Sequence, residues 1–464
     1  MNSFMSLFRK GLDISNVYGL VKSLFTRKDS TASSISTVTV TMLIFLLNLI
    51  TGILTARYLG PVGKGELSAM TLWFIFLAGM LMLGLPSALL FNLKKRQEDS
   101  PGLYVAGVLL CLATGCAALL IGFAGIPYWL HGYSPEVVRY AQWFMLASPV
   151  LLLEYINNSV LQARGEFTLF NKLRILPHIG TVLILLVLIF TNKLTPFSGA
   201  VAYALPTIPI TLGLTVRLLW RYLPRLKQMK QSVRHLVSYS LRSSGVDVMG
   251  TLIMYMDQVV VIMLLSPSNL GLYLVAVSLA KVVNVIQTSL ALVVFPKASG
   301  LQKEEAIELV KKVFRISVFV TLIVALLFMF IGPLVLNLLY GSQYHEAVSI
   351  FRILLLEVVI GGGTLILSQA FMSVGKPGIC SIQQVIGLSV SLVLMVLLVP
   401  RYGLLFTGIS LLAATCVRFV FILSQYKFTL KTTIPRLLIT RDDIQWLLRQ
   451  VNLGSHVTKQ TNDA

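Results

Sequence analysis

Apolar residues dominate this chain in long runs, and polar residues gather in the short segments between them. Most of the runs reach the ~20 residues with which an α-helix crosses the hydrocarbon core of a bilayer. Because a chain in lipid must satisfy its own backbone hydrogen bonds, such runs predict transmembrane helices. Twelve spans are predicted, near residues 36–57, 67–92, 103–126, 138–161, 173–191, 197–219, 244–265, 271–295, 314–339, 347–372, 379–399 and 404–425.

A repeated pattern of turn residues divides the spans into two sets of six. The motif Leu-x-Pro-x3-Gly follows the first span at residues 59–65 and the seventh span at residues 265–271, an offset of 206 residues. Pro127 and Pro333, which end the third and ninth spans, show the same offset of 206. The pattern predicts an all-α integral membrane protein with two six-helix lobes, related by an internal parallel repeat. This is a two-lobe transporter plan, with the substrate path between the lobes.

Polar segments at the ends and in the middle complete the predicted domain organisation. The N-terminal segment is basic and amphipathic, which is typical of a helix lying on the cytoplasmic leaflet, and the tail contains a second interfacial helix near residues 440–451. We expect five parts: an arm (1–35), an N-lobe (36–220), a basic linker (221–243), a C-lobe (244–425) and a cytoplasmic tail (426–464).

The basic charge of the chain indicates its orientation in the membrane and does not indicate nucleic-acid binding. Only 12% of residues are charged, although the net charge is +20; a soluble domain carries about 25% charged residues. With the N-terminus inside, 30 of the 38 Lys and Arg fall in cytoplasmic segments, which is the positive-inside pattern. We expect a multi-pass protein of the inner membrane with both termini cytoplasmic and no nucleic-acid partner. Five bases fall on outer turns: Arg57, Lys64, Arg139, Lys193 and Arg401.

Two charges near the bilayer midplane are the first functional candidates. Asp257 precedes Pro267 by ten residues and Lys281 follows Gly271 by ten, so both lie ~15 Å from the turn that joins their spans. A charge at this depth costs several kcal/mol unless it is paired or hydrated. An acid and a base at one depth predict either an ion pair or two facing sides of a polar cavity.

The remaining in-span charges extend this set. Arg352 and Arg418 can contact an anionic substrate or extend their side chains toward the membrane surface, and Arg57 at the outer mouth can contact substrate or anchor the helix. The acids Glu357 and Glu154 can pair with a cation of the cavity or bind a coupling proton or sodium ion. Asp257 has the same two roles open, besides that of joining helices.

Several motifs resemble those of the polysaccharide-exporting flippases (Wzx-type), which share a superfamily with multidrug-and-toxin extrusion transporters and lipid II flippases. They are Ala56-Arg57-Tyr58-Leu59-Gly60-Pro61 with Gly65, Met256-Asp257-Gln258 through Pro267 to Tyr273, Phe295-Pro296-Lys297-Ala298-Ser299, and Leu339-Tyr340-Gly341-Ser342-Gln343-Tyr344. The resemblance covers roughly residues 36–425. At Gly63-Lys64-Gly65 the chain departs from the family, which has an aromatic residue before the last glycine; we expect this to affect a turn and not the chemistry.

The resemblance implies alternating access that carries an undecaprenyl-diphosphate-linked oligosaccharide from the cytoplasmic to the outer leaflet. For this, Lys281, Arg352, Arg418 and Arg57 would contact the substrate. Its partners would be membrane lipids and the polymerase and chain-length machinery of polysaccharide biosynthesis.

Other classes of protein fit the sequence less well. Outer connections are about a dozen residues or shorter, the five histidines are scattered, and no HExxH or Gly-rich phosphate loop occurs. We therefore expect no enzyme activity, no cofactor and no metal site. A cation-coupled drug antiporter of the same fold and a lipid II flippase stay open as alternatives, although a drug antiporter would favour a more acidic interior.

Overall fold

The computed structural model describes residues 30–222 and 229–439, and this part of the chain is helical with no β-strand. The arm predicted for residues 1–35 lies outside the described residues up to residue 29, and the helix predicted near 440–451 lies outside them altogether. The elements are α3 (Ser30–Leu81), α4 (Leu85–Lys95), η1 (Gln97–Asp99), α5 (Ser100–Trp129), α6 (Pro135–Phe144), η2 (Met145–Ala147), α7 (Ser148–Ala163), α8 (Phe167–Phe190), α9 (Pro196–Ala204), α10 (Thr207–Tyr222), α11 (Met229–Leu264), α12 (Pro267–Ser299), α13 (Lys303–Tyr340), η4 (Ser342–Tyr344), α14 (Ala347–Ser373), α15 (Gly378–Tyr402) and α16 (Leu404–Phe428).

The described residues contain 11 helical segments long and apolar enough to cross a membrane. The first of them, Ser36–Leu81, has 46 residues and would be ~70 Å long if straight, about twice the thickness of a bilayer core. It is broken at Gly60, whose φ of 71° and ψ of 178° are not helical, and a helix resumes at Pro61. Counting the two sides of Gly60 separately confirms the predicted twelve spans and the all-α membrane fold.

Three predicted spans are interrupted in the structure. The second ends at Leu81 and continues as α4, because Leu83 and Gly84 adopt positive φ values of 47° and 78°. The fourth is built from α6, η2 and α7, and the sixth from α9 and α10. Hydrophobicity predicts the length of a span. It does not predict a local break in the backbone, because the residues at the break can be as apolar as their neighbours.

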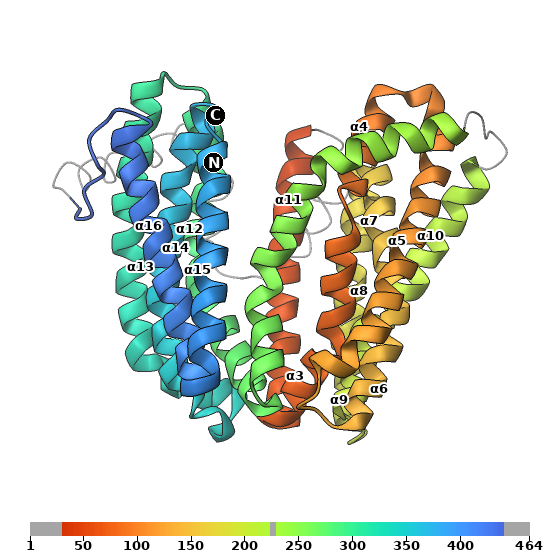
Figure 1. Cartoon of the computed structure of the whole chain (residues 1–464), viewed down its shortest axis with the longest axis horizontal. Helices are drawn as coiled ribbons and strands as arrows, with labels where there is room; N and C mark the ends of the chain where they lie inside the picture. The colour runs from red at the N-terminus through yellow and green to blue at the C-terminus, as the bar shows by residue number, and fades with distance from the viewer. Residues whose placement is uncertain (1–29, 223–228, 440–464) are drawn as a thin grey trace, which may run out of the picture.

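The helices form two bundles that meet at one end and diverge toward the other (Figure 1). One bundle contains α3 to α10 and the other contains α12 to α16. α11 packs against α3, α4 and α5 of the first bundle and against α12, α15 and α16 of the second. It begins at Met229, so residues 229–243 of the predicted linker are helical.

The buried apolar residues follow the same plan. One large cluster contains residues of both bundles, such as Trp73 of α3 and Tyr273 of α12. Two further clusters each belong to one side: one around Leu89 and Leu103, and the other around Phe314 and Phe371. The bundles therefore share one core where they meet and have separate cores where they diverge. Following the charge-based prediction, we call the shared end outer and the divergent end inner.

Candidate functional site

The second bundle encloses a cavity of about 280 Å³, the C-lobe chamber, between α11, α12, α14, α15 and α16. Four charged side chains predicted from the sequence line it together: Asp257, Lys281, Glu357 and Arg418. Two carboxylates thus face two cations in one chamber. The chamber lies between membrane-spanning helices. Its charged groups therefore require ion pairs, water or a bound ligand to offset the cost of removing them from bulk solvent.

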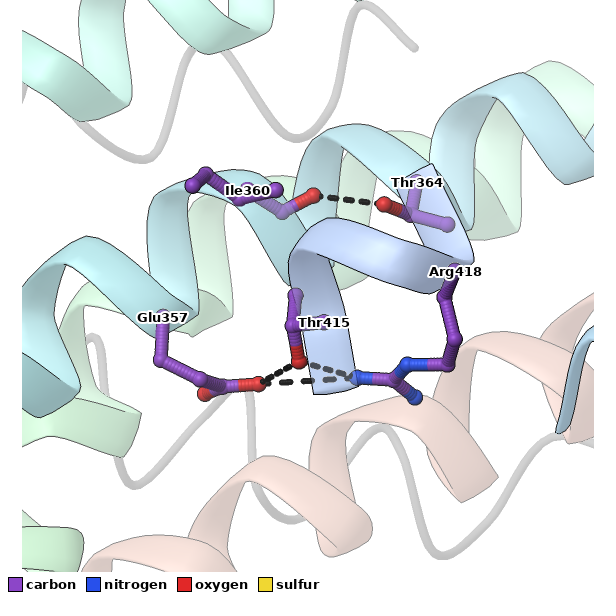
Figure 2. Close-up of polar contacts among 5 residues, drawn as sticks. All are labelled: Glu357, Ile360, Thr364, Thr415 and Arg418. Atoms are coloured by element: carbon purple, nitrogen blue, oxygen red, sulfur yellow. Dashed lines mark hydrogen bonds and ion pairs between the residues drawn. The ribbon is translucent and has the colours of Figure 1, made fainter. Parts of the chain in front are cut away.

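Glu357 and Arg418 point toward one another across α14 and α16, with Thr415 between them (Figure 2). Glu357 Oε1 accepts a hydrogen bond of 2.7 Å from the Thr415 hydroxyl and lies 3.6 Å from Arg418 Nη2. Arg418 Nη2 donates to Thr415 Oγ1 at 2.5 Å. The side chains of Glu357 and Arg418 remain 22% and 25% exposed, so the pair is open to the chamber.

Asp257 is held differently, by the hydroxyl of the buried Tyr273 on α12, which donates to Asp257 Oδ2. Asp257 Oδ1 is buried, and no described residue donates to it. Lys281 is exposed toward the same chamber and forms no ion pair with Asp257. Of the two arrangements predicted for Asp257 and Lys281, the structure therefore shows two lining groups of one polar cavity.

Replacing Tyr273 with phenylalanine should lower the free energy of unfolding by about 1–3 kcal/mol, because it leaves a buried carboxylate without its donor. Unfolding of the purified protein in detergent measures this, and Tyr128→Phe, at a tyrosine that is 79% exposed, is the control. Equal stability of the two variants would show that the Tyr273 hydroxyl contributes nothing.

The structure places Arg352 and Arg57 outside the C-lobe chamber. Arg352 is exposed on α14. Arg57 lies at the outer end, where Nη1 donates to the Leu338 carbonyl at 2.5 Å, and its own carbonyl accepts a hydrogen bond of 3.1 Å from Gln343 Nε2. Both partners belong to the second bundle, so Arg57 joins the bundles where they meet.

The first bundle encloses a larger cavity of about 460 Å³, the N-lobe chamber, between α3, α7, α8, α9 and α10. Glu154, which the sequence analysis selected, lines it. Three further titratable side chains line it that the sequence analysis did not select: Lys64, Arg174 and His178. This chamber holds two permanent cations against one carboxylate, whereas the C-lobe chamber has equal numbers of both.

The interpretation of Lys64 as an outer-turn residue was wrong. Lys64 lies within α3 and is 9% exposed, and its ammonium donates to Thr55 Oγ1 at 2.8 Å. The departure from the family motif at this position thus places a cation in a chamber. One signal could have found it: proline favours the first turn of a helix, so a helix beginning at Pro61 places residue 64 inside it. Arg174 likewise lies seven residues inside α8, which begins at Phe167.

The outer closure is made by the repeated motif itself. Pro61 and Pro267 begin two membrane-spanning segments, and a Cβ on Gly65 would collide with the carbonyl oxygen of Pro267, while a Cβ on Gly271 would collide with that of Pro61. The two helix starts therefore cross in reciprocal backbone contact. Only glycine permits helices to approach this closely.

No group of three or more His, Cys, Asp or Glu within residues 30–222 and 229–439 is arranged to hold a metal ion. The structure thus has two helical bundles, each with a chamber lined by charged side chains. The fold of the whole described chain aligns with solved transporters, among them members of the multidrug/oligosaccharidyl-lipid/polysaccharide (MOP) superfamily. The lipid II flippase MurJ, in an inward closed conformation, aligns with a TM-score of 0.73 and 14% identity over 92% of this chain and 93% of its own.

A multidrug resistance MATE transporter in an inward-facing conformation aligns with a TM-score of 0.67 and 17% identity over 84% of this chain and 96% of its own. At the level of sequence, residues 53–349 match the family described as "Polysaccharide biosynthesis protein". This match covers more than half of the chain, and the protein belongs to that family. It is also 21% identical to the probable low-salt glycan biosynthesis flippase Agl15 of Haloferax volcanii, over 74% of this chain and 73% of the relative.

Proposed function

We propose that this protein is a flippase that carries a lipid-linked oligosaccharide from the inner to the outer leaflet of the cytoplasmic membrane by alternating access. An undecaprenyl-diphosphate-linked repeat unit has an anionic diphosphate, a polar glycan and a lipid tail that can stay in the bilayer. Cations and hydroxyl groups in the chambers can replace the water around the first two parts. The observation that supports this most is the pair of charged chambers inside a member of the polysaccharide biosynthesis family.

The described conformation fits the first step of such a cycle. The bundles are closed at the outer end by Arg57, Gly65 and Gly271 and diverge at the inner end (Figure 1). A substrate head group made in the cytoplasm would therefore meet the open end. Rocking of one bundle against the other would break the outer contacts and close the inner end, in keeping with alternating access.

The charges bear on the alternative substrates. A drug antiporter for organic cations needs carboxylates in excess, whereas the N-lobe chamber contains Lys64 and Arg174 against Glu154 alone. This favours a substrate with negative charge. A lipid II precursor carries the same diphosphate and differs in its glycan, so it stays a second candidate for the same path. In the flippase proposal, Asp257, Glu357 and Glu154 pair with the chamber cations or bind a coupling ion.

Deletion of the protein in its own cells should cause lipid-linked oligosaccharide to accumulate and surface polysaccharide to disappear. Extraction of lipid-linked glycans, with surface glycan and drug sensitivity measured beside them, tests this. Wild type should restore both, and Lys281→Ala should not, since it removes a cation from the C-lobe chamber. Unchanged glycan with new sensitivity to cationic drugs would contradict the flippase and favour the antiporter. Accumulated lipid II would identify that precursor.

A further inference from the structure

Lys64 is a buried cation for which the described part of the chain supplies no counterion. Its ammonium has three N–H groups, and Thr55 accepts from it at 2.8 Å. None of the carboxylates in the described ranges forms an ion pair with it. A charge that is removed from water without a partner is costly, and such a group inside a membrane helix is a functional candidate.

The single carboxylate of the N-lobe chamber is engaged elsewhere. Glu154 lies close enough to Arg174 to interact with it electrostatically. Arg174 lies seven residues from the inner end of α8, and Lys64 lies three residues after Pro61 at the outer end of its helix. These positions are ~10 Å and ~5 Å from opposite membrane faces. Lys64 is therefore the uncompensated cation at the closed end of the chamber.

Arg174 also has N–H donors that could bind an anion. Its guanidinium makes one long hydrogen bond, of 3.5 Å, to Thr41 Oγ1 and lies over the Phe170 ring, 5.1 Å from the ring centroid. A guanidinium has five N–H donors, so most of them have no acceptor in these contacts. Between the two cations the chamber is lined by neutral polar groups such as Asn48, Thr71 and Thr181. A phosphate group entering at the inner end would thus meet a cation at each end of one cavity.

We propose that the N-lobe chamber is a phosphate-binding site for the diphosphate of the transported lipid, with Lys64 as its principal cation and Arg174 as the cation nearer the inner end. This assignment rests on the proposed function and deepens it. It places the binding of the anionic group in the first bundle, at residues that neither the family match nor the relatives assign, and leaves the charge-balanced C-lobe chamber for neutral polar parts or a coupling ion.

A structural role for Lys64 makes a different prediction. Its bond to Thr55 joins the helical segments on the two sides of Gly60, so Lys64 could act only by holding this break. Thr55→Val removes the acceptor at a residue with 0% exposure and leaves the charge in place. Lys64→Gln removes the charge. If Lys64 binds phosphate, Lys64→Gln should lose phosphate affinity and Thr55→Val should keep it. If Lys64 has only a structural role, both variants should lose the same amount of affinity.

The test is calorimetric titration of the purified full-length protein in detergent with farnesyl diphosphate. Loss of a charge-assisted hydrogen bond should weaken binding about tenfold or more in Lys64→Gln. Lys64→Arg, Thr55→Val and the control Arg139→Gln, at an exposed outer residue, should bind as wild type does. Farnesol, which lacks the diphosphate, should not bind. Inorganic pyrophosphate binding as tightly as farnesyl diphosphate would identify free diphosphate as the ligand, and weaker binding would identify the lipid head group; both support a phosphate site.

Wild-type affinity in Lys64→Gln, or an equal loss in Thr55→Val, would overturn the assignment. If Lys64→Gln does not fold, acetylation of the wild-type protein gives the answer. Farnesyl diphosphate should slow the acetylation of Lys64, read by mass spectrometry, and farnesol should not; an unprotected Lys64 would overturn the proposal. In cells, restoration of glycan export by Lys64→Gln would refute the phosphate site and leave the flippase proposal standing.

Discussion

Adding a single methyl group at Gly65 or at Gly271 should eliminate transport. In Gly65→Ala the new Cβ meets the carbonyl oxygen of Pro267, and in Gly271→Ala it meets that of Pro61. The colliding atom is backbone in both cases, so no side chain can rotate away and the two helices must separate. Overpacking of this kind costs about 1–3 kcal/mol, which here falls on the closed outer state alone. The equilibrium should shift away from the described conformation by about tenfold or more.

Two measurements check this. Glycan export by the variants should fall to the level of the deletion strain. An impermeant thiol reagent added from outside should label Asn48→Cys, in the N-lobe chamber, faster when Gly65→Ala is also present. Gly52→Ala is the matched control, because nothing lies within 4 Å of a Cβ built at this glycine of the same helix. Normal export and unchanged labelling in both variants would show that the reciprocal contact does not close the outer end.

Breaking the Glu357–Arg418 pair should have the second-largest effect, on stability and transport together. Arg418→Met leaves Glu357 in the chamber without its cation and should lower the free energy of unfolding by about 1–3 kcal/mol. The double variant Glu357→Gln/Arg418→Met has no unpaired charge and should recover most of this loss. It should still not transport, because the chamber has lost half of its charged groups.

Chemical unfolding in detergent measures the stability of wild type, Glu357→Gln, Arg418→Met and the double variant, which together form a double-mutant cycle. Glycan export measures the function of the same four proteins. Arg401→Met, at an exposed residue at the end of α15, controls for the loss of an arginine. A double variant that is no more stable than Arg418→Met would show that the two side chains do not act as a pair. A double variant that transports would remove the pair from the proposed mechanism.

The proposed internal repeat gains support from the same outer contact. The two copies of Leu-x-Pro-x3-Gly, 206 residues apart in the sequence, pack against each other so that each glycine faces the proline of the other copy. A reciprocal contact is what two copies related by an axis through the interface would make. The duplication itself stays a prediction.

The sequence indicated the C-lobe chamber better than the N-lobe chamber. Asp257, Lys281, Glu357 and Arg418 stand out because each interrupts a long apolar run, and the structure brings all four to one cavity. Lys64 and Arg174, the two permanent cations of the N-lobe chamber, could not be recognised from the interruption of an apolar run. Each lies near the end of a span, where hydrophobicity cannot separate a residue inside the helix from a residue in the turn.

The sequence by itself determined the class of the protein, its twelve spans and most of the charges inside them, because the length of an apolar run and the cost of a buried charge are local properties. Only the tertiary structure decided which charges share a chamber and how the bundles close. These depend on helix rotation and on contacts between residues hundreds of positions apart, such as Arg57 with Leu338. Spans that are apolar nearly all round have no periodicity that specifies such a rotation.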